Sequence, residues 1–329
     1  MNSKYFLFLI ITVIAGNLNI TAQTREFRPG EVWRDTHGDT INAHGGGILY
    51  INNNYYWFGE KRNRHGSEGV NVYSSKDLYN WKYEGVALGQ SEDTLSDIRK
   101  GCVMERPKVI YNKLTKKYVM WFHLELKGKG YSAARAAVAV SDKITGPYQF
   151  ISSFRPNGNM SRDMTLFADD DGAAYQVYSS RENYDLRITK LTDDYLAATS
   201  KDTMLFSKHR EAPALFKYQN KYYLITSGCT GWAPNKADLH VATSLLGPWQ
   251  PVDGNPMEGP DADSTFGSQS AYIQPVAGKK GNFIFIADKW NPKDLRDSRY
   301  VWLPVQLKNN ELKIEWLRSW SLDFWDTNK

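Results

Sequence analysis

The feature of this sequence that most restricts its fold is a unit that recurs with a period of about 45 residues. Each unit holds an apolar segment, a tight turn, a second segment rich in Tyr and Trp, and a third that ends near Ser-Asp or near Gly-Pro and an aromatic residue. The first two segments span 45–60, 108–123, 164–180, 213–227 and 271–288, and the third spans 70–81, 136–148, 186–195, 239–249 and 300–316. Short strands at this period are typical of a β-propeller with roughly five blades around one pocket.

The residue types within each unit explain why such units would stack. The first strand is almost continuously apolar, and the second supplies the β-branched and aromatic side chains that suit a half-buried pleated surface. One blade cannot bury both of its faces, and an aromatic content of 14% provides large side chains for packing between blades. We therefore predict an all-β fold, a five-bladed β-propeller with a central active-site pocket. The alternative, a β-sandwich, gives no reason for the repeated Ser-Asp and Gly-Pro-aromatic endings.

The N-terminus has the pattern of a secretory signal peptide. A lysine at position 4 precedes an apolar run from Tyr5 to Ala15, and the small residues Thr21 and Ala22 follow. The run is too short for a typical membrane span, and no cysteine follows it that would carry a lipid. We predict a signal peptide over 1–22, a single propeller domain over 23–329, and a secreted or periplasmic location.

Charge and cysteine content narrow the possible partners. The net charge of +5 is modest for 329 residues and the basic residues are scattered, so we expect neither nucleic-acid binding nor membrane insertion. We expect a monomer. Cys102 and Cys229 fit either one disulfide, which export would permit, or two free thiols beside strands, which we favour.

Three carboxylates stand at equivalent places in successive units. They are Glu105 in Met-Glu-Arg-Pro, Asp163 in Ser-Arg-Asp-Met, and Glu211 in Arg-Glu-Ala-Pro. Each precedes the apolar first strand, and in two of them a proline follows by two positions, as suits the beginning of a strand. Convergent carboxylates can cleave a glycosidic bond, because one protonates the leaving oxygen while another group activates water. A carboxylate that stands alone at a strand end is usually solvated or paired with a base. Recurrence of the carboxylates at equivalent places favours an active site.

These motifs together resemble glycoside hydrolase family 43. The Glu-Ala-Pro of the fourth unit, the aspartate before Phe-Ala-Asp-Asp-Asp-Gly in the third, and the five-unit period carry the resemblance. The segments Ala-His-Gly-Gly-Gly (43–47), Tyr-Tyr-Trp-Phe-Gly-Glu (55–60) and Glu-Arg-Pro (105–107) are similar to the exo-β-1,3-galactanase branch. The resemblance implies an inverting glycoside hydrolase that acts on an oligo- or polysaccharide. It makes Glu211 the general acid and Asp163 the residue that tunes its pKa and orients the sugar.

One member of the family pattern is missing. Most relatives carry an aspartate in the first blade as general base, where this chain has Ala43 and His44. Two residues match the candidates of the galactanase branch: Glu105 and Gln269, the latter within Gly-Ser-Gln-Ser. We rank Glu105 first because an ionised carboxylate accepts a proton from water, although it could instead bind sugar hydroxyls. Gln269 would need an imidic acid tautomer, or would only hold the water.

Sugar binding needs flat aromatic faces and polar groups for the hydroxyls. Our candidates at strand ends and in loops are Glu60, Tyr178, Thr226, Trp232 and His44, with a structural role as the alternative for His44. The run Asp169-Asp170-Asp171-Gly172 predicts a hairpin turn and lacks the ligand spacing of an EF-hand, so we expect no metal and no cofactor.

The sequence thus predicts an exported, exo-acting hydrolase that releases galactose from β-1,3-galactan of the arabinogalactan type. One alternative is an α-L-arabinofuranosidase or β-xylosidase of the same family. The other is a propeller that binds glycans without cleaving them, a possibility raised by the missing first-blade aspartate.

Overall fold

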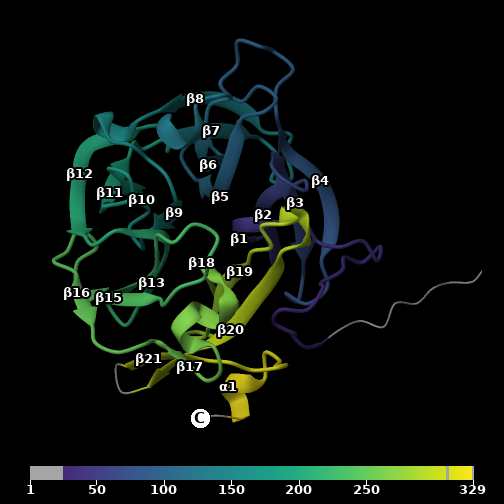
Figure 1. Ribbon diagram of the computed structural model, residues 1–329, viewed down its shortest axis with the longest axis vertical. Helices are drawn as coiled ribbons and strands as arrows, with labels where there is room; N and C mark the ends of the chain where they lie inside the picture. Colours follow the sequence, from purple (N-terminus) through teal and green to yellow (C-terminus); the bar gives the residue numbers. More distant parts are fainter. Residues whose placement is uncertain (1–24, 309–310, 328–329) are drawn as a thin grey trace, which may run out of the picture.

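The computed structural model describes residues 25–308 and 311–327. Five small sheets surround a central axis in this part of the chain (Figure 1), which confirms the five-bladed propeller and excludes the sandwich. The first blade holds β1 (His44–Ile51), β2 (Asn54–Arg62), β3 (Ser67–Ser75) and β4 (Lys82–Gly89). The second holds β5 (Val103–Asn112), β6 (Lys117–Glu125), β7 (Arg135–Ser141) and β8 (Gln149–Phe154). The third holds β9 (Met164–Ala168), β10 (Ala174–Ser180), β11 (Asp185–Leu191) and β12 (Ala198–Ser207).

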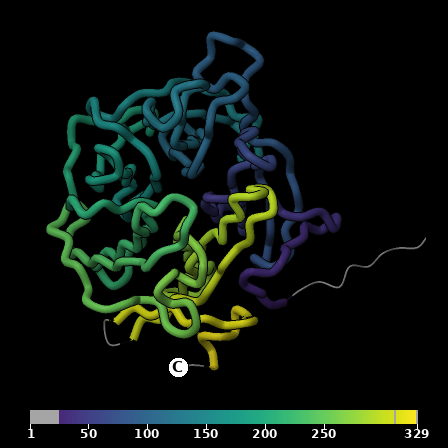
Figure 2. Tube along the Cα trace, in the orientation of Figure 1, coloured from purple at the N-terminus to yellow at the C-terminus, as the bar shows by residue number. Residues whose placement is uncertain are grey.

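The last two blades complete the ring. The fourth holds β13 (Arg210–Tyr218), β14 (Lys221–Gly228), β15 (Asp238–Ala242) and β16 (Gln250–Val252). The fifth holds β18 (Gln269–Pro275), β19 (Phe283–Lys289), β20 (Arg299–Lys308) and β21 (Glu311–Glu315), with β17 (Met257–Glu258) parallel to β21 at its edge. The first strand of each blade is innermost: β1 contacts β5 and β18, and β13 contacts β9 and β18. Figure 2 shows the same closed ring as a backbone trace.

The outermost strands were not foreseen from the sequence. β8, β12 and β16 are mostly exposed or half-buried, so they lack the apolar and aromatic residues that marked the inner strands. Burial explains the difference, because an outer strand packs on few neighbours and its sequence is free to be polar.

The prolines of the repeated acidic motifs lie inside strands rather than at their beginnings. Pro107 and Pro213 follow Arg106 and Ala212, whose φ angles of 55° and 53° are left-handed. At both places the pairing register shifts, as in a β-bulge. A bulge leaves one residue out of the ladder, so a proline without an N–H fits there.

The first blade has the same irregularity without an acid. The register of β1 shifts between His44 and Gly47, and Gly45 has a φ of 58°. His44 therefore occupies in blade one the place that Glu105 and Glu211 occupy in blades two and four. A bulge bends the strand and redirects its side chains, so each of these residues leaves the regular alternation of its strand.

Blades one and five are joined through an aromatic cluster and the chain ends. The indole of Trp57 lies 4.8 Å from both Tyr300 and Trp302 by ring centroids. The backbone of Phe27 pairs with that of Trp320, with N–O distances of 2.7 and 3.1 Å. The segment before the first blade thus fastens to the segment after the last.

The cysteines and the acidic turn are as expected from the sequence. Cys102 and Cys229 are free thiols, the first buried and the second half-buried. Residues 169–172 form the expected turn, in which Asp169 accepts hydrogen bonds from Lys217 and Tyr222 of the next blade. Within the described ranges, no helix is long and apolar enough to cross a membrane. The predicted signal peptide over 1–22 lies outside the described residues.

One buried histidine predicts how stability depends on pH. His240 in β15 is 1% exposed, stacks on Phe206 at 4.1 Å, and has no hydrogen-bond partner for either ring nitrogen within the described chain. Burial lowers the pKa of His240 to about 4. The unfolded chain therefore binds one more proton between pH 6.5 and 4, and the free energy of unfolding should fall through this window by up to about 3 kcal/mol. In His240→Leu the part of this decrease in the free energy of unfolding that His240 causes should be absent.

The measurement is denaturant unfolding at several pH values for the parent, His240→Leu and, as a control, His65→Leu, whose histidine is exposed. An equal loss of stability in the parent and in His240→Leu between pH 6.5 and 4 would contradict the assignment.

Candidate active site

A cavity of about 330 Å³ lies at the axis end where the innermost strands begin. It brings together the predicted residues Glu105, Asp163, Glu211 and Gln269, each from a different blade. Its walls are formed by Glu60, Arg62, Glu105, Arg106, His123, Tyr131, Arg162, Asp163, Asn183, Glu211, Cys229, Gly231, Trp232, Gln269 and Trp290. The repeated position at the start of the innermost strands therefore does converge on one site.

Three predicted sugar contacts do not line this cavity. Tyr178 is fully buried between blades and donates to Asp202 at 2.5 Å. Thr226 is also buried, and its hydroxyl accepts from Arg210 at 3.2 Å. His44 is 0% exposed, with Nδ1 3.3 Å from Asp288, which matches the structural alternative. Their prediction rested on position near strand ends, but the alternation of side chains along the strand sends them into the packing.

Two predicted contacts do reach the cavity. Trp232, in the loop after β14, is 44% exposed and packs edge-on against Trp290 at 5.4 Å. Glu60, in β2, lies on the floor and is almost completely enclosed. The indole can offer a flat face to a sugar ring, and the carboxylate can meet hydroxyls that displace part of its present contacts.

Hydrogen bonds fix the amide of Gln269 in one orientation. Its Oε1 accepts from Arg106 at 2.5 Å and from Trp290 at 3.0 Å, both of which can only donate. Its Nε2 then donates to Glu211 Oε1 at 2.9 Å and to Ser227 at 3.1 Å. Every hydrogen-bonding position of this side chain is used, and the oxygen and nitrogen cannot be exchanged.

Glu211 is surrounded by groups that act on its proton affinity. Burial and the nearby charge of Asp163 raise the pKa of Glu211 to about 7, against the opposing charge of Arg106. Besides Gln269, Asn183 donates to Glu211 Oε2 at 2.9 Å. A carboxyl with a pKa near neutrality can hold a proton at pH 7 and release it to a leaving group.

Asp163 stands just before β9 and pairs with Arg106. Its Oδ2 lies 2.8 Å from Arg106 Nη2, and the side chain is 14% exposed. The same guanidinium thus links Asp163 to Gln269 and, through Gln269, to Glu211. This arrangement places the carboxylate of Asp163 where it can influence the pKa of Glu211.

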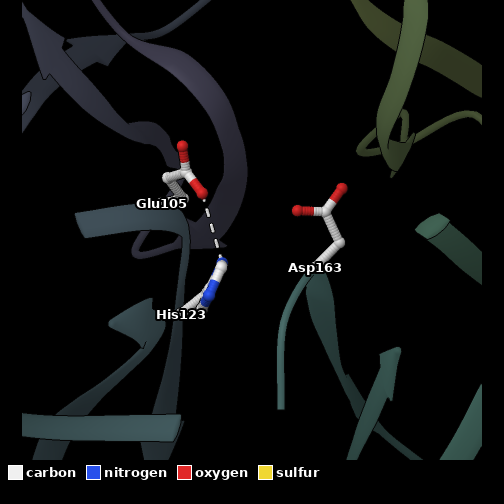
Figure 3. A group of neighbouring side chains, drawn as sticks. All are labelled: Glu105, His123 and Asp163. Carbon is white, nitrogen blue, oxygen red and sulfur yellow. Dashed lines mark ion pairs between the residues drawn. The ribbon is translucent and has the colours of Figure 1, made fainter. Parts of the chain in front are cut away.

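Glu105 belongs to a buried chain of charges on the other wall (Figure 3). Its Oε1 accepts from Arg62 and from Tyr131, both at 2.8 Å, and its Oε2 lies 3.2 Å from His123 Nδ1. His123 Nε2 in turn lies 2.8 Å from Glu125. Burial alone raises the pKa of Glu105, but the contact with His123 and the charge of Arg62 outweigh it and hold that pKa well below its usual range.

His123 carries a positive charge in this chain. Burial alone would lower its pKa, but its contacts with the carboxylates of Glu105 and Glu125 raise the pKa of His123 to about 9. Glu125 also accepts from the backbone N–H of Ala134 at 2.9 Å, so its position is fixed. Glu105 is consequently ionised and held in place from behind.

Gly45 in β1 leaves room for Glu60, and the next two glycines leave room for the backbone of Phe58 and the side chain of Lys108. A Cβ on Gly45 would lie 2.1 Å from Glu60 Oε1, an impossible contact. Glu60 accepts from the backbone N–H of Arg106 at 2.8 Å and from Arg62 Nε at 2.6 Å. Below it, the buried Lys108 donates to the carbonyl of Gly45 at 2.8 Å, which joins the bulges of β1 and β5.

Sequence reasoning missed the basic and aromatic partners of the acids. Arg62, His123 and Glu125 stand in strands that are otherwise apolar, two positions from another polar residue on the same face. This spacing of two residues could have revealed them, because residues two apart share one face of a strand and charges on a buried face must be paired. Trp290 follows β19 in a loop and offered no periodic signal.

Glu105, His123 and Asp163 are the described residues best placed to meet a cation, since one ligand atom of each lies within 4.8 Å of the others (Figure 3). Each carboxylate is already paired with an arginine, and the histidine is protonated. A metal ion would therefore have to displace the proton of His123 and compete with Arg62 and Arg106 for the two carboxylates.

Comparison with known proteins supplies independent information on this site. The sequence profile of "Glycosyl hydrolases family 43" matches residues 42–285. A solved family 43 β-1,3-galactosidase with galactodeoxynojirimycin is 51% identical, covering 90% of this chain and 100% of that chain, with a TM-score of 0.88. An exo-β-1,3-galactanase from Phanerochaete chrysosporium with β-1,3-galactotriose is 35% identical, covering 91% and 68%, with a TM-score of 0.84.

A curated relative has a different named activity. A xylan 1,3-β-xylosidase from Vibrio sp is 26% identical over 207 residues, which are 57% of this chain and 37% of that protein. The chain therefore spans little more than a third of the length of this relative.

The geometry predicts that removing the charge of Asp163 lowers the pKa of Glu211. In Asp163→Asn the repulsion that disfavours the Glu211 carboxylate is lost and Arg106 is left less neutralised, so the pKa should fall by about one pH unit. NMR titration of ¹³C-labelled glutamate carboxyls would measure it, with Glu211→Gln to assign the signal. Asp142→Asn, at an exposed site, is the control and should leave the titration unchanged. An unaltered midpoint in Asp163→Asn would contradict the coupling.

Proposed function

The chain belongs to glycoside hydrolase family 43, and from this membership we propose that it releases terminal galactose from β-1,3-galactan chains with inversion. The observation that carries the proposal is Glu211, a carboxyl with a pKa of about 7 in a cavity that it shares with an ionised Glu105. Likeness to a β-1,3-galactosidase and to an exo-β-1,3-galactanase supports the choice of sugar and linkage.

The size of the cavity supports an exo action. At about 330 Å³ it lies at the small end of the range for ligand sites, which suits one terminal sugar better than the middle of a long chain. Trp232 at its mouth would stack on a sugar face, while Glu60 and Asp163 would hold hydroxyls on the walls.

Glu211 would act as the general acid. With a pKa of about 7 it is partly protonated at neutral pH and can donate to the oxygen of the bond that breaks. Asp163 would serve this step by keeping the proton affinity of Glu211 high without contacting the leaving group.

Gln269 fits poorly as the group that activates water. Both lone pairs of its oxygen are taken by Arg106 and Trp290, so no acceptor remains for a proton. Its nitrogen also lies 2.9 Å from Glu211, whereas an inverting enzyme separates its two groups by about 6.5–9.5 Å to admit sugar and water. We infer that Gln269 orients the acid.

Glu105 remains the proposed water-activating residue. It lines the cavity and is ionised. Its Oε1 accepts from Arg62 and Tyr131, and its Oε2 lies 3.2 Å from His123. Its low basicity implies that the proton moves late, when the attacking water has already become acidic through bond formation.

A second candidate function is a β-xylosidase activity, or the related α-L-arabinofuranosidase. The similarity to a xylan 1,3-β-xylosidase favours it. Xylose lacks the exocyclic CH₂OH of a hexose. The glycan-binding alternative has less support, because a protein that only binds has no use for a carboxyl tuned to neutrality.

Export is also a proposal. The pattern of residues 1–22, a lysine followed by an apolar run and small residues, supports secretion or a periplasmic location, where polysaccharide substrates are found.

The choice of substrate predicts which compounds are hydrolysed. The parent should release galactose from β-1,3-galactobiose, measured by chromatography, and Glu211→Gln should be slower by about 10²- to 10⁴-fold. A panel of nitrophenyl β-galactoside, β-xyloside and α-L-arabinofuranoside gives the comparison. Activity on the pentosides alone would favour the second candidate, and tight galactobiose binding without turnover would favour a glycan-binding protein.

The role of Glu105 predicts rescue by an external nucleophile. Glu105→Ala should lose about 10²- to 10⁴-fold in kcat, and azide should restore turnover by forming a glycosyl azide of inverted configuration. Azide should not rescue Gln269→Ala, because loss of this amide misplaces the acid Glu211 and leaves the water-activating residue intact. Product configuration can be determined by NMR. Rescue of Gln269→Ala, with no rescue of Glu105→Ala, would reverse the assignment.

A further inference from the structure

The turn between β10 and β11 has an unusual backbone. Arg181, Glu182 and Asn183 are three consecutive non-glycine residues with left-handed φ angles of 46°, 55° and 66°. This conformation is unfavourable for L-residues, and asparagine tolerates it better than most. A sequence of three persists only where surrounding contacts hold it.

Those contacts are present on both sides of the turn. Arg181 makes two hydrogen bonds of 2.7 Å to Asp185 across the turn. Glu182 pairs with Arg162, which reaches over from the segment before β9. These contacts hold the turn to β11 and to Arg162 in the cavity wall. In this position Asn183 points at Glu211.

Asn183 has one amide atom in use and one without a partner. Its Nδ2 donates to Glu211 Oε2 at 2.9 Å. Its Oδ1 is buried and has no hydrogen-bond partner within the described residues. A buried amide oxygen without a donor is costly, so it is expected to meet a donor in some state of the protein.

The fixed orientation of Gln269 determines where the proton of Glu211 can lie. Gln269 Nε2 must donate to Glu211 Oε1, because turning its amide would set its nitrogen against the donors of Arg106 and Trp290. A proton on Oε1 would oppose that donor. Protonated Glu211 therefore carries its hydrogen on Oε2, where the present donor of Asn183 would oppose it unless the amide turns over.

We propose that Asn183 is the positioning residue of the acid: its amide donates to ionised Glu211, turns over when Glu211 is protonated, and keeps the transferable proton on Oε2. This inference rests on the proposed role of Glu211 as general acid. Turning the amide costs no existing bond of Oδ1, since that atom has no partner in the described chain.

The other groups around Glu211 cannot replace Asn183. Asp163 and Glu105 act on Glu211 through their charge and Arg106 through its opposite charge, while the thiol of Cys229, beyond β14, is a weak donor. The amide of Asn183 can both donate to a carboxylate and accept from a carboxylic acid. The amide of Gln269 is held in one orientation by Arg106 and Trp290, and the thiol of Cys229 is weak in both roles.

The first test is direct observation of the amide. In protein labelled with ¹⁵N-asparagine, the side-chain signals of Asn183, assigned by their loss in Asn183→Gly, should shift with the midpoint at which Glu211 titrates. The same signals should not titrate in Glu211→Gln. A pH-independent Asn183 signal in the parent, while Glu211 itself titrates, would overturn the proposal.

The second test uses leaving groups that differ in their need for an acid. Asn183→Gly keeps a residue suited to the left-handed backbone and removes the amide, so it should lose at least about ten-fold in kcat on β-1,3-galactobiose and much less on a dinitrophenyl glycoside. Asn183→Asp should move the alkaline limb of the kcat/KM profile to higher pH, because a second carboxylate disfavours ionised Glu211.

Asn53→Gly is the matched control, since Asn53 is a left-handed asparagine in the exposed β1–β2 turn. It should leave the rates and the pH profile unchanged. The proposal is overturned if Asn183→Gly loses kcat equally on both substrates and Asn183→Asp leaves the alkaline limb in place. Asn183 would then be a structural residue. If Glu211→Gln itself retains full activity on galactobiose, the proposed function fails instead.

Discussion

The site depends on two buried arginines that neutralise its carboxylates. Arg62 bonds Glu60 and Glu105, and Arg106 pairs with Asp163 and bonds Gln269. Both guanidinium groups also lie over the ring of Trp290, at 5.7 and 5.9 Å from its centroid. Removing one partner of a buried ion pair costs about 3–5 kcal/mol, because the remaining charge has lost its compensation. Several acids can therefore be gathered at the axis only while both arginines are present.

The acids near the two arginines also differ in proton affinity. The wall of Arg62 carries Glu105, whose pKa is held low, while Glu211 lies near Asp163 and keeps a pKa of about 7. Under the proposed function, this separation of pKa values suits Glu105 to accept a proton and Glu211 to give one. The bulges in β5 and β13 supply the geometry of this division, since both acids precede a left-handed residue and a proline in a shifted register.

The period of the sequence was sufficient to predict the five blades, and the repeated acids were sufficient to locate the cavity. Inner strands are predictable because both faces are buried and their residues must be apolar or aromatic. The polar outer strands such as β12 carry no such constraint and were missed. Tyr178 and Thr226 were assigned to the cavity from their position along the chain, but the direction of each side chain depends on register, which the sequence does not state. The partners of the acids, such as His123 and Trp290, come from distant segments that only the closed ring brings together.

The crowded first blade limits how this enzyme could change by single substitutions. An aspartate in place of His44 would set its carboxylate against Asp288, and one in place of Gly45 would collide with Glu60. A carboxylate at either position would first require a compensating change at Asp288 or Glu60, and loss of Glu60 alone would leave Arg62 short of a partner. The substitutions are thus mutually dependent. The contacts of His44 with Asp288 and of Gly45 with Glu60 thus disfavour a new carboxylate in blade one.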